Sequence, residues 1–103
     1  MSILLDYQGK EVRLTEERLA HILNHPEMTG MEAKIAEALR HPQLVRKSRS
    51  DESVSLSYRF YTQTDIGDKW LCVVVKYLQD DAFVITAYFT NKPKKGEDLW
   101  QSK

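Results

Sequence analysis

Three long apolar patterns occupy the second half of the chain. They span residues 54–62, 70–78 and 82–90, and each is rich in β-branched and aromatic residues. Polar residues fill the intervening segments 63–68 and 79–81, as is typical of hairpin turns. The pattern predicts an antiparallel meander of three strands, each with one apolar and one more polar face.

Shorter patterns in the first half predict a hairpin and a helix. Segments 3–7 and 11–14 flank a polar turn that contains Gly9, which is typical of a small hairpin. Thr15 is a typical helix N-cap and is followed by two acidic residues, which the helix dipole favours in the first turn. We expect this helix to reach about Asn24.

A second helix is expected to follow a capping box at 29–32. It should end at Arg40, because the residue before Pro42 is disfavoured from helical geometry. Residues 44–47 are expected to form a short edge strand. The predicted architecture is a single α+β domain, residues 1–103, with two short helices packed on a curved, mainly antiparallel sheet of four to five strands.

Register arithmetic predicts which side chains share a face, because a slip of one residue moves every side chain to the other face. Apolar faces stay together if a six-residue loop pairs Phe60 with Leu71. A three-residue turn then pairs Val75 with Ile85. Four side chains on the opposite face would converge to hold one phosphate-sized anion: Arg59, Lys76, Thr86 and Tyr88.

Lys76 favours a functional interpretation of this patch. It follows the apolar run 71–75 on a central strand, where no carboxylate partner is evident from the sequence. The alternative is that these are ordinary residues of a solvated sheet face, because Lys, Arg, Thr and Tyr are common there.

Composition predicts a soluble cytoplasmic protein without a global attraction to nucleic acid. The 15 basic and 15 acidic residues balance, although basic residues cluster in 40–49 and 92–95, where they can contact phosphates or simply be solvated. The lone Cys72 cannot form an internal disulfide and suits a reducing compartment. No apolar run approaches the roughly 18–20 residues of a membrane helix, and the first residues do not resemble a secretory signal.

The histidines are the candidate proton-transfer groups. His21 and His25 are four residues apart, so they lie on one side of the first helix, a spacing that also suits a metal pair. A metal needs a third ligand, which the sequence does not place, so we expect no metal and no other cofactor. The alternative is a metal protein built on His21 and His25, which stoichiometric zinc in the purified protein would favour. His25 and His41 each follow a helix, where a cation stabilises the terminal carbonyls. His21 has no such structural role and is the stronger functional candidate.

Several short motifs occur in an order that resembles a known nuclease-fold family. They are Arg18-x-x-His21-Ile22, His25-Pro26-Glu27, Tyr58-Arg59-Phe60-Tyr61, Leu71-Cys72-Val73-Val74-Val75-Lys76, Thr86-Ala87-Tyr88 and Lys95-Gly96-x-x-Leu99-Trp100. Together they resemble the phage-associated barnase–EndoU–colicin–RelE-like nuclease family over most of the chain. The resemblance implies metal-independent RNA cleavage by attack of a ribose 2′-OH on the adjacent phosphate.

The resemblance also implies roles for individual residues. His21 would be the general acid or base, Arg59 and Lys76 would stabilise the phosphorane charge, and Thr86 and Tyr88 would position the phosphate or assist proton transfer. Its candidate substrate-binding residues are His25, Tyr61 and Lys95. The implied partners are RNA and a neutralising protein, as for a toxin or phage-conflict protein. The alternative is a catalytically inactive module of the same fold that binds RNA or protein. It arises because toxins of this fold are often strongly basic, whereas this chain has no net charge and should have only modest non-specific affinity for RNA.

Overall fold

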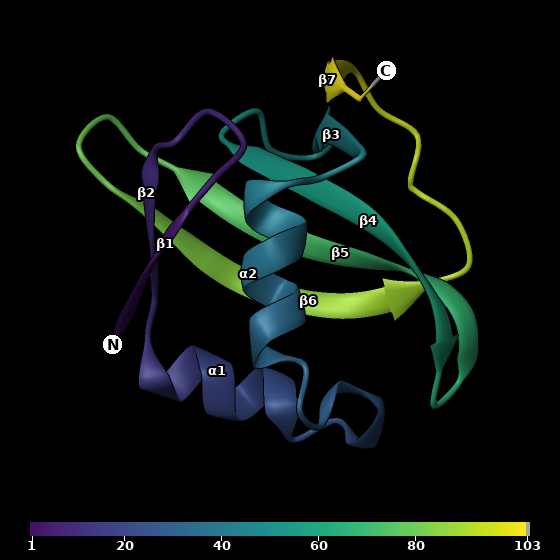
Figure 1. Ribbon diagram of the computed structural model, residues 1–103. Coiled ribbons are helices and arrows are strands. Elements are labelled where there is room, and N and C mark those ends of the chain that lie inside the picture. Colours follow the sequence, from purple (N-terminus) through teal and green to yellow (C-terminus); the bar gives the residue numbers. More distant parts are fainter. Residues whose placement is uncertain (103) are drawn as a thin grey trace.

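The computed structural model describes residues 1–102 and shows two α-helices and a 3-10 turn beside one seven-stranded sheet (Figure 1). The elements are β1 (Ser2–Leu5), β2 (Glu11–Leu14), α1 (Glu16–Leu23), η1 (Pro26–Met28), α2 (Glu32–Arg40), β3 (Leu44–Lys47), β4 (Val54–Thr64), β5 (Gly67–Tyr77), β6 (Ala82–Thr90) and β7 (Asp98–Gln101). Within residues 1–102, no helix is both long enough and apolar enough to span a bilayer.

The strand order is β1-β2-β6-β5-β4-β3-β7, with β2 and β6 parallel and the other neighbours antiparallel. The α+β class and the predominantly antiparallel sheet are confirmed, but the expected four or five strands are too few. The N-terminal hairpin joins the meander through β2, and β7 adds to β3 at the other edge. The short strand at 44–47 is confirmed, although β7 takes the edge position that the sequence had suggested for it.

Local signals placed α1 correctly. The Thr15 side chain accepts a hydrogen bond from the Arg18 backbone N–H at 3.2 Å, which confirms the N-cap. The helix ends at Leu23, with Asn24 as its C-cap. The proline at position 26 begins η1, in which its missing N–H costs nothing.

The start of α2 differs from the expected capping box. Thr29 ends η1, and Met31 occupies the N-cap of α2 without a side-chain hydrogen bond. Gly30 makes the turn between them with a φ of 76°, a conformation that other residues rarely adopt. The end of α2 at Arg40 is confirmed.

One face of the sheet, here called the helix face, packs against both helices (Figure 1). Ile22 of α1 and Ile35 and Leu39 of α2 are fully buried there. The strands contribute Val12, Leu71, Val73, Val75, Val84 and Ala87 to the same core. This core fixes the orientation of the sheet and leaves the opposite face free of helices.

The register between β5 and β6 is confirmed over most of its length. Leu71 pairs with Phe89 and Val73 pairs with Ala87, as expected. The predicted pair of Val75 with Ile85 is wrong, because an irregularity between Val74 and Val75 shifts the register. Extra residues of this kind let a strand bend without losing its apolar face.

The predicted register between β4 and β5 is wrong by one residue. Phe60 pairs with Trp70 and Arg59 with Leu71. The predicted six-residue loop is instead a tight turn, and the ladder is irregular between Tyr61 and Thr64, where Gln63 has a φ of 56°. A change of one residue reverses the faces, so Arg59 lies on the helix face.

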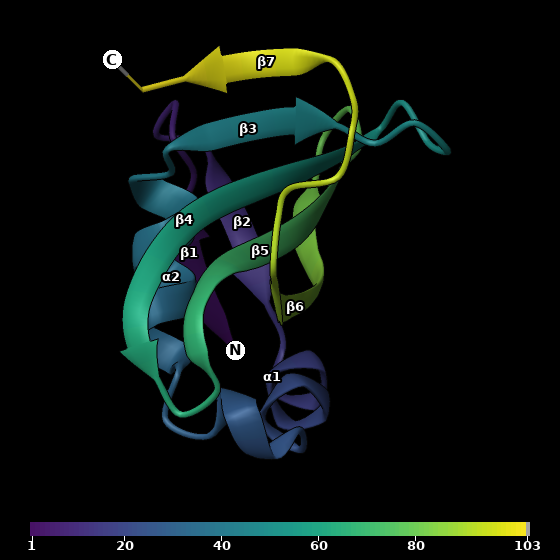
Figure 2. The same cartoon turned by 90° about the vertical axis from the view of Figure 1, so that its right-hand side faces the viewer.

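The reversal is accommodated because the face opposite the helices has a small core of its own. We call it the strap face, since residues 91–97, the strap, cross it between β6 and β7 (Figure 2). Its buried members are Leu44, Val54, Leu56, Tyr58 and Cys72. Both faces of β4 are therefore partly buried. The apolar side chains of this strand, at alternate positions, point to the strap rather than to the helices.

The alternate, polar side chains of β4 point to the helix face, where a serine is buried. Ser57 is 1% exposed, and its Oγ has no hydrogen-bond partner among the described residues. Since an unpaired buried hydroxyl costs about 1–3 kcal/mol, we expect Ser57→Ala to raise the free energy of unfolding by about 1 kcal/mol in urea denaturation. Ser55→Ala, at a more exposed position on the same face, is the control and should gain less. A loss of stability in Ser57→Ala would contradict this account.

Candidate functional site

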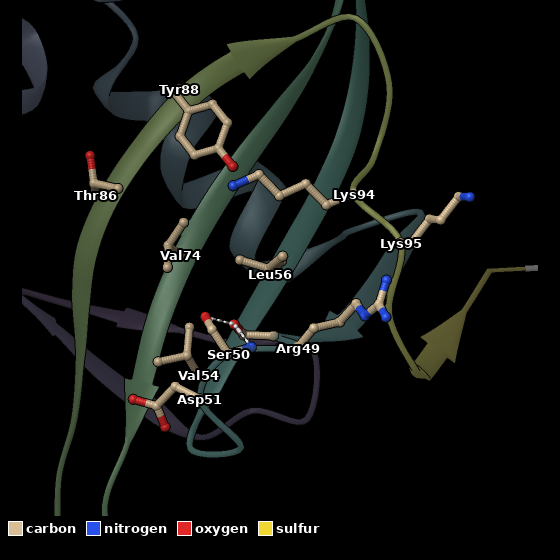
Figure 3. A pocket seen from close by; sticks show the side chains of 11 residues that line it. Arg49, Ser50, Asp51, Val54, Leu56, Val74, Thr86, Tyr88, Lys94 and Lys95 are labelled. Carbon is tan, nitrogen blue, oxygen red and sulfur yellow. Dashed lines mark hydrogen bonds between the residues drawn. The ribbon is translucent and has the colours of Figure 1, made fainter.

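An open cleft of about 560 Å³ lies on the strap face (Figure 3). Apolar side chains from the central strands line its interior, and polar and charged side chains surround them. The lining residues are Ser48, Arg49, Ser50, Asp51, Val54, Leu56, Val74, Thr86, Tyr88, Lys94 and Lys95. The cleft therefore combines a hydrophobic interior with three cations.

Two hydroxyl groups from β6 reach the cleft because the register of the meander places them there. Thr86 pairs with Val74 and Tyr88 pairs with Cys72, so both lie on the strap face. They are two residues apart, which separates alternate residues of a strand by about 7 Å. This part of the predicted anion patch agrees with the structure.

The loop between β3 and β4 supplies the acidic end of the cleft. Asp51 Oδ2 accepts a hydrogen bond from Lys76 Nζ at 2.7 Å, and Oδ1 accepts bonds from the N–H and hydroxyl of Ser53. The Lys76 ammonium, and then Ser53, hold the pKa of Asp51 well below its ordinary value. The expectation that Lys76 has no carboxylate partner is wrong, because Asp51 reaches it from a loop 25 residues away.

The strap fixes Lys94 at the cleft through both backbone polar groups of that residue. The Lys94 N–H donates to the Tyr58 hydroxyl at 3.0 Å, and its carbonyl accepts from Arg46 Nη1 at 2.8 Å. Arg46 Nε also donates to Asp98 at 2.7 Å, which ties the strap to the start of β7. The Lys94 ammonium lies 5.8 Å from the centre of the Tyr88 ring. Figure 3 shows the two side chains next to each other at the cleft. Its backbone is thus held while its charge faces the cleft.

Burial keeps the phenols and the thiol below the cleft in their neutral forms. It raises the pKa of Tyr58 to about 12 and the pKa of Cys72 to about 11. Burial, followed by the neighbouring Cys72, also raises the pKa of Tyr88 above its ordinary value. At neutral pH the Tyr88 hydroxyl is therefore a hydrogen-bond donor, and the buried Cys72 is a thiol rather than a nucleophilic thiolate.

The structure brings only part of the predicted site together. Thr86, Tyr88 and Lys95 line the cleft, and Lys76 adjoins it through Asp51. Arg59 does not join them, because it lies on the helix face and bonds to the carbonyl of His41 and the carboxylate of Glu37. The predicted convergence of Arg59 with Thr86 and Tyr88 on one face is therefore wrong, because Arg59 pairs with Leu71 and lies on the other face.

Tyr61 also lies on the helix face, where its hydroxyl donates to Glu37 of α2. His21 and His25 lie at the exposed surface of α1 and just beyond it, with ring centres 6.2 Å apart. Neither lines the cleft. Within residues 1–102, no group of three or more His, Cys, Asp or Glu side chains is placed to bind a metal. His21, for which a catalytic role is predicted, lies on α1 and does not line the cleft.

Three cleft residues were not singled out individually by sequence reasoning: Arg49, Asp51 and Lys94. The signal for Arg49 and Lys94 was the two basic clusters. These two residues are 45 positions apart in the sequence and line one cleft in the fold. Asp51 carried no signal, because an aspartate in a polar loop is ordinary.

The chain matches no family model, no curated protein and no solved structure.

Proposed function

We propose that the protein binds RNA in the strap-face cleft and cleaves its backbone without a metal ion. One observation carries the proposal: Arg49, Lys94 and Lys95 surround a cleft that also presents the hydroxyls of Thr86 and Tyr88. Cations and neutral hydroxyl donors suit a phosphodiester, whose oxygens accept charge-assisted hydrogen bonds. Because the net charge of the chain is zero, the attraction is local to this cleft.

The chemistry would be attack of the ribose 2′-OH on the adjacent phosphorus, which forms a 2′,3′-cyclic phosphate and releases a 5′-hydroxyl. The cations would stabilise the extra negative charge of the phosphorane. Tyr88, protonated at neutral pH, would donate a proton or a hydrogen bond to the leaving oxygen, and its raised pKa makes it a weak acid. Asp51 is the carboxylate at hand to accept the 2′-OH proton, but its lowered pKa makes it a weak base, so we expect slow cleavage.

The resemblance to the barnase–EndoU–colicin–RelE-like family supports the same chemistry. It also supports assigning the fold to the barnase/RelE-like nuclease type. In that setting the protein would act as a toxin or phage-conflict ribonuclease with a neutralising protein partner. The site geometry supports a cleft-based mechanism rather than one centred on His21 and Arg59.

Removing the strap cations tests the binding step. We expect Lys94→Ala/Lys95→Ala to weaken binding of single-stranded RNA about tenfold or more. The slope of log K against log salt concentration should become shallower by about 0.7 for each lost phosphate contact. The control is Lys10→Ala/Lys34→Ala, which also removes two lysines. Like Lys94, both lie over tyrosine rings, but they are away from the cleft. Equal effects of the two double variants, measured by fluorescence anisotropy at several salt concentrations, would contradict the proposal.

Cleavage is tested by incubating RNA with the protein in EDTA. We expect products with cyclic phosphate ends from RNA and none from DNA of the same sequence, which lacks the 2′-OH. His21→Ala should leave cleavage unchanged if the chemistry takes place in the cleft.

A second candidate function is RNA binding without cleavage. It is favoured by one specific observation: the described residues that line the cleft include no histidine. Salt-dependent RNA binding without products in EDTA would favour it over the ribonuclease.

A further inference from the structure

A partly exposed aromatic pair lies on the strap face beside the cleft: Phe60 is exposed and Trp70 is half-buried. Phe60 of β4 and Trp70 of β5 are cross-strand partners, with ring centres 5.3 Å apart. Phe60 is 39% exposed, whereas Tyr58, two residues earlier on the same face, is fully buried. The strap docks on Tyr58 through Lys94 and leaves the Phe60 ring accessible.

The pair is continuous with the cleft. Trp70 contacts Tyr58 edge-on at 6.5 Å between ring centres, and the next cross-strand row carries Cys72 and Tyr88. Successive rows on one face are about 7 Å apart. The aromatic pair therefore lies one cross-strand row away from the row of Tyr88.

The strap also brings positive charge past the pair. Thr90 is the cross-strand partner of Trp70, and its hydroxyl donates to the carbonyl of Lys92 at the start of the strap. From there the strap leads through Lys94 to Lys95 at the cleft. A ligand lying along this face would meet aromatic rings and cations side by side.

We propose that Phe60 and Trp70 form a stacking subsite for an unpaired base, next to the phosphate-binding cleft. The inference rests on the proposed function and narrows its ligand to single-stranded RNA. Proteins that bind single strands combine aromatic side chains, on which bases stack, with cations along the backbone. A paired base cannot reach such a subsite, because its faces are covered by the neighbouring bases of the duplex.

The test uses a 2′-O-methyl RNA single strand of about ten nucleotides, which spans a typical single-strand site. This strand cannot be cleaved through its 2′ position. An abasic strand with the same number of phosphates is the comparison ligand. Phe60→Leu keeps the apolar packing and removes the aromatic face, whereas Ile66→Ala, at the exposed tip of the same hairpin, is the matched control.

We expect Phe60→Leu to bind the base-bearing strand about tenfold more weakly and the abasic strand as tightly as the parent protein. Ile66→Ala should bind both strands like the parent. Because the chain has two tryptophans, Trp100→Phe leaves Trp70 as the only one. In that variant the base-bearing strand should quench the fluorescence of Trp70 and the abasic strand should not.

Two results would overturn the inference in different ways. Salt-dependent binding of both strands with an unchanged affinity in Phe60→Leu would refute the stacking subsite alone. Absence of salt-dependent binding of either strand to the parent protein would refute the proposed function and, with it, the subsite.

Discussion

Asp6→Ala should lower the free energy of unfolding by about 3 kcal/mol, because it removes a buried carboxylate that joins the N-terminal hairpin turn to β5. Asp6 is 1% exposed. Its Oδ1 accepts the backbone N–H groups of Gln8 and Lys10 in the hairpin turn, and its Oδ2 accepts the hydroxyl of Tyr77 at 2.7 Å. The variant leaves all three donors without this acceptor.

Urea denaturation and thermal unfolding measure the effect of Asp6→Ala, which should lower Tm by roughly 15 °C for a domain of this size. Asp80→Ala, at an exposed turn, is the control and should change stability little. A double-mutant cycle with Tyr77→Phe should show strong coupling, because each change removes the same hydrogen bond. A loss below about 1 kcal/mol in Asp6→Ala would mean that the turn does not depend on this carboxylate.

Gly96→Ala should displace the strap from β3 and with it the cations of the cleft. A Cβ at position 96 would lie 2.6 Å from the backbone carbonyl oxygen of Lys47, which is too close and belongs to a strand that cannot easily move. The strap must therefore shift, and the backbone bond from Lys47 to Glu97 at 2.8 Å should weaken. We expect a stability loss of about 2 kcal/mol, in the range of other steric changes.

Two measurements on Gly96→Ala report the strap itself. Trypsin should cut faster after Lys94 and Lys95, and the affinity for single-stranded RNA should fall about as far as in Lys94→Ala/Lys95→Ala. Gly30→Ala is the control, because its φ of 76° costs stability without any atom within 4 Å of the new Cβ. If Gly96→Ala resists trypsin like the parent, the strap is not held by this close approach.

Local signals in the sequence were sufficient where one segment determines its own structure. The Thr15 cap and the prolines at 26 and 42 bound the helices, because capping and proline geometry act within one turn. The Thr29 capping box failed since Gly30 turns the chain before α2 begins. The three long strands were also correctly expected.

The candidate site depended on contacts that the sequence does not carry locally. Alternation assigned the apolar side of β4 to the helices, but that side faces the strap and forms a second core with Leu56, Tyr58 and Cys72. The turn at Gln63 then shifted the register by one residue and moved Arg59 out of the predicted patch. Of that patch, Thr86 and Tyr88 remained at the cleft, because the register of β5 with β6 was correct there.

The sequence by itself therefore determined the α+β class, the ends of the helices and the strands that build the meander, because caps, prolines and side-chain alternation act over a few residues. Only the tertiary structure decided which face of β4 meets the helices and which cations share a cleft. Those outcomes depend on the strap, which brings Lys94 to within hydrogen-bond distance of Tyr58, 36 residues away along the chain. A contact at that separation is set by the packing of the whole sheet rather than by either segment alone.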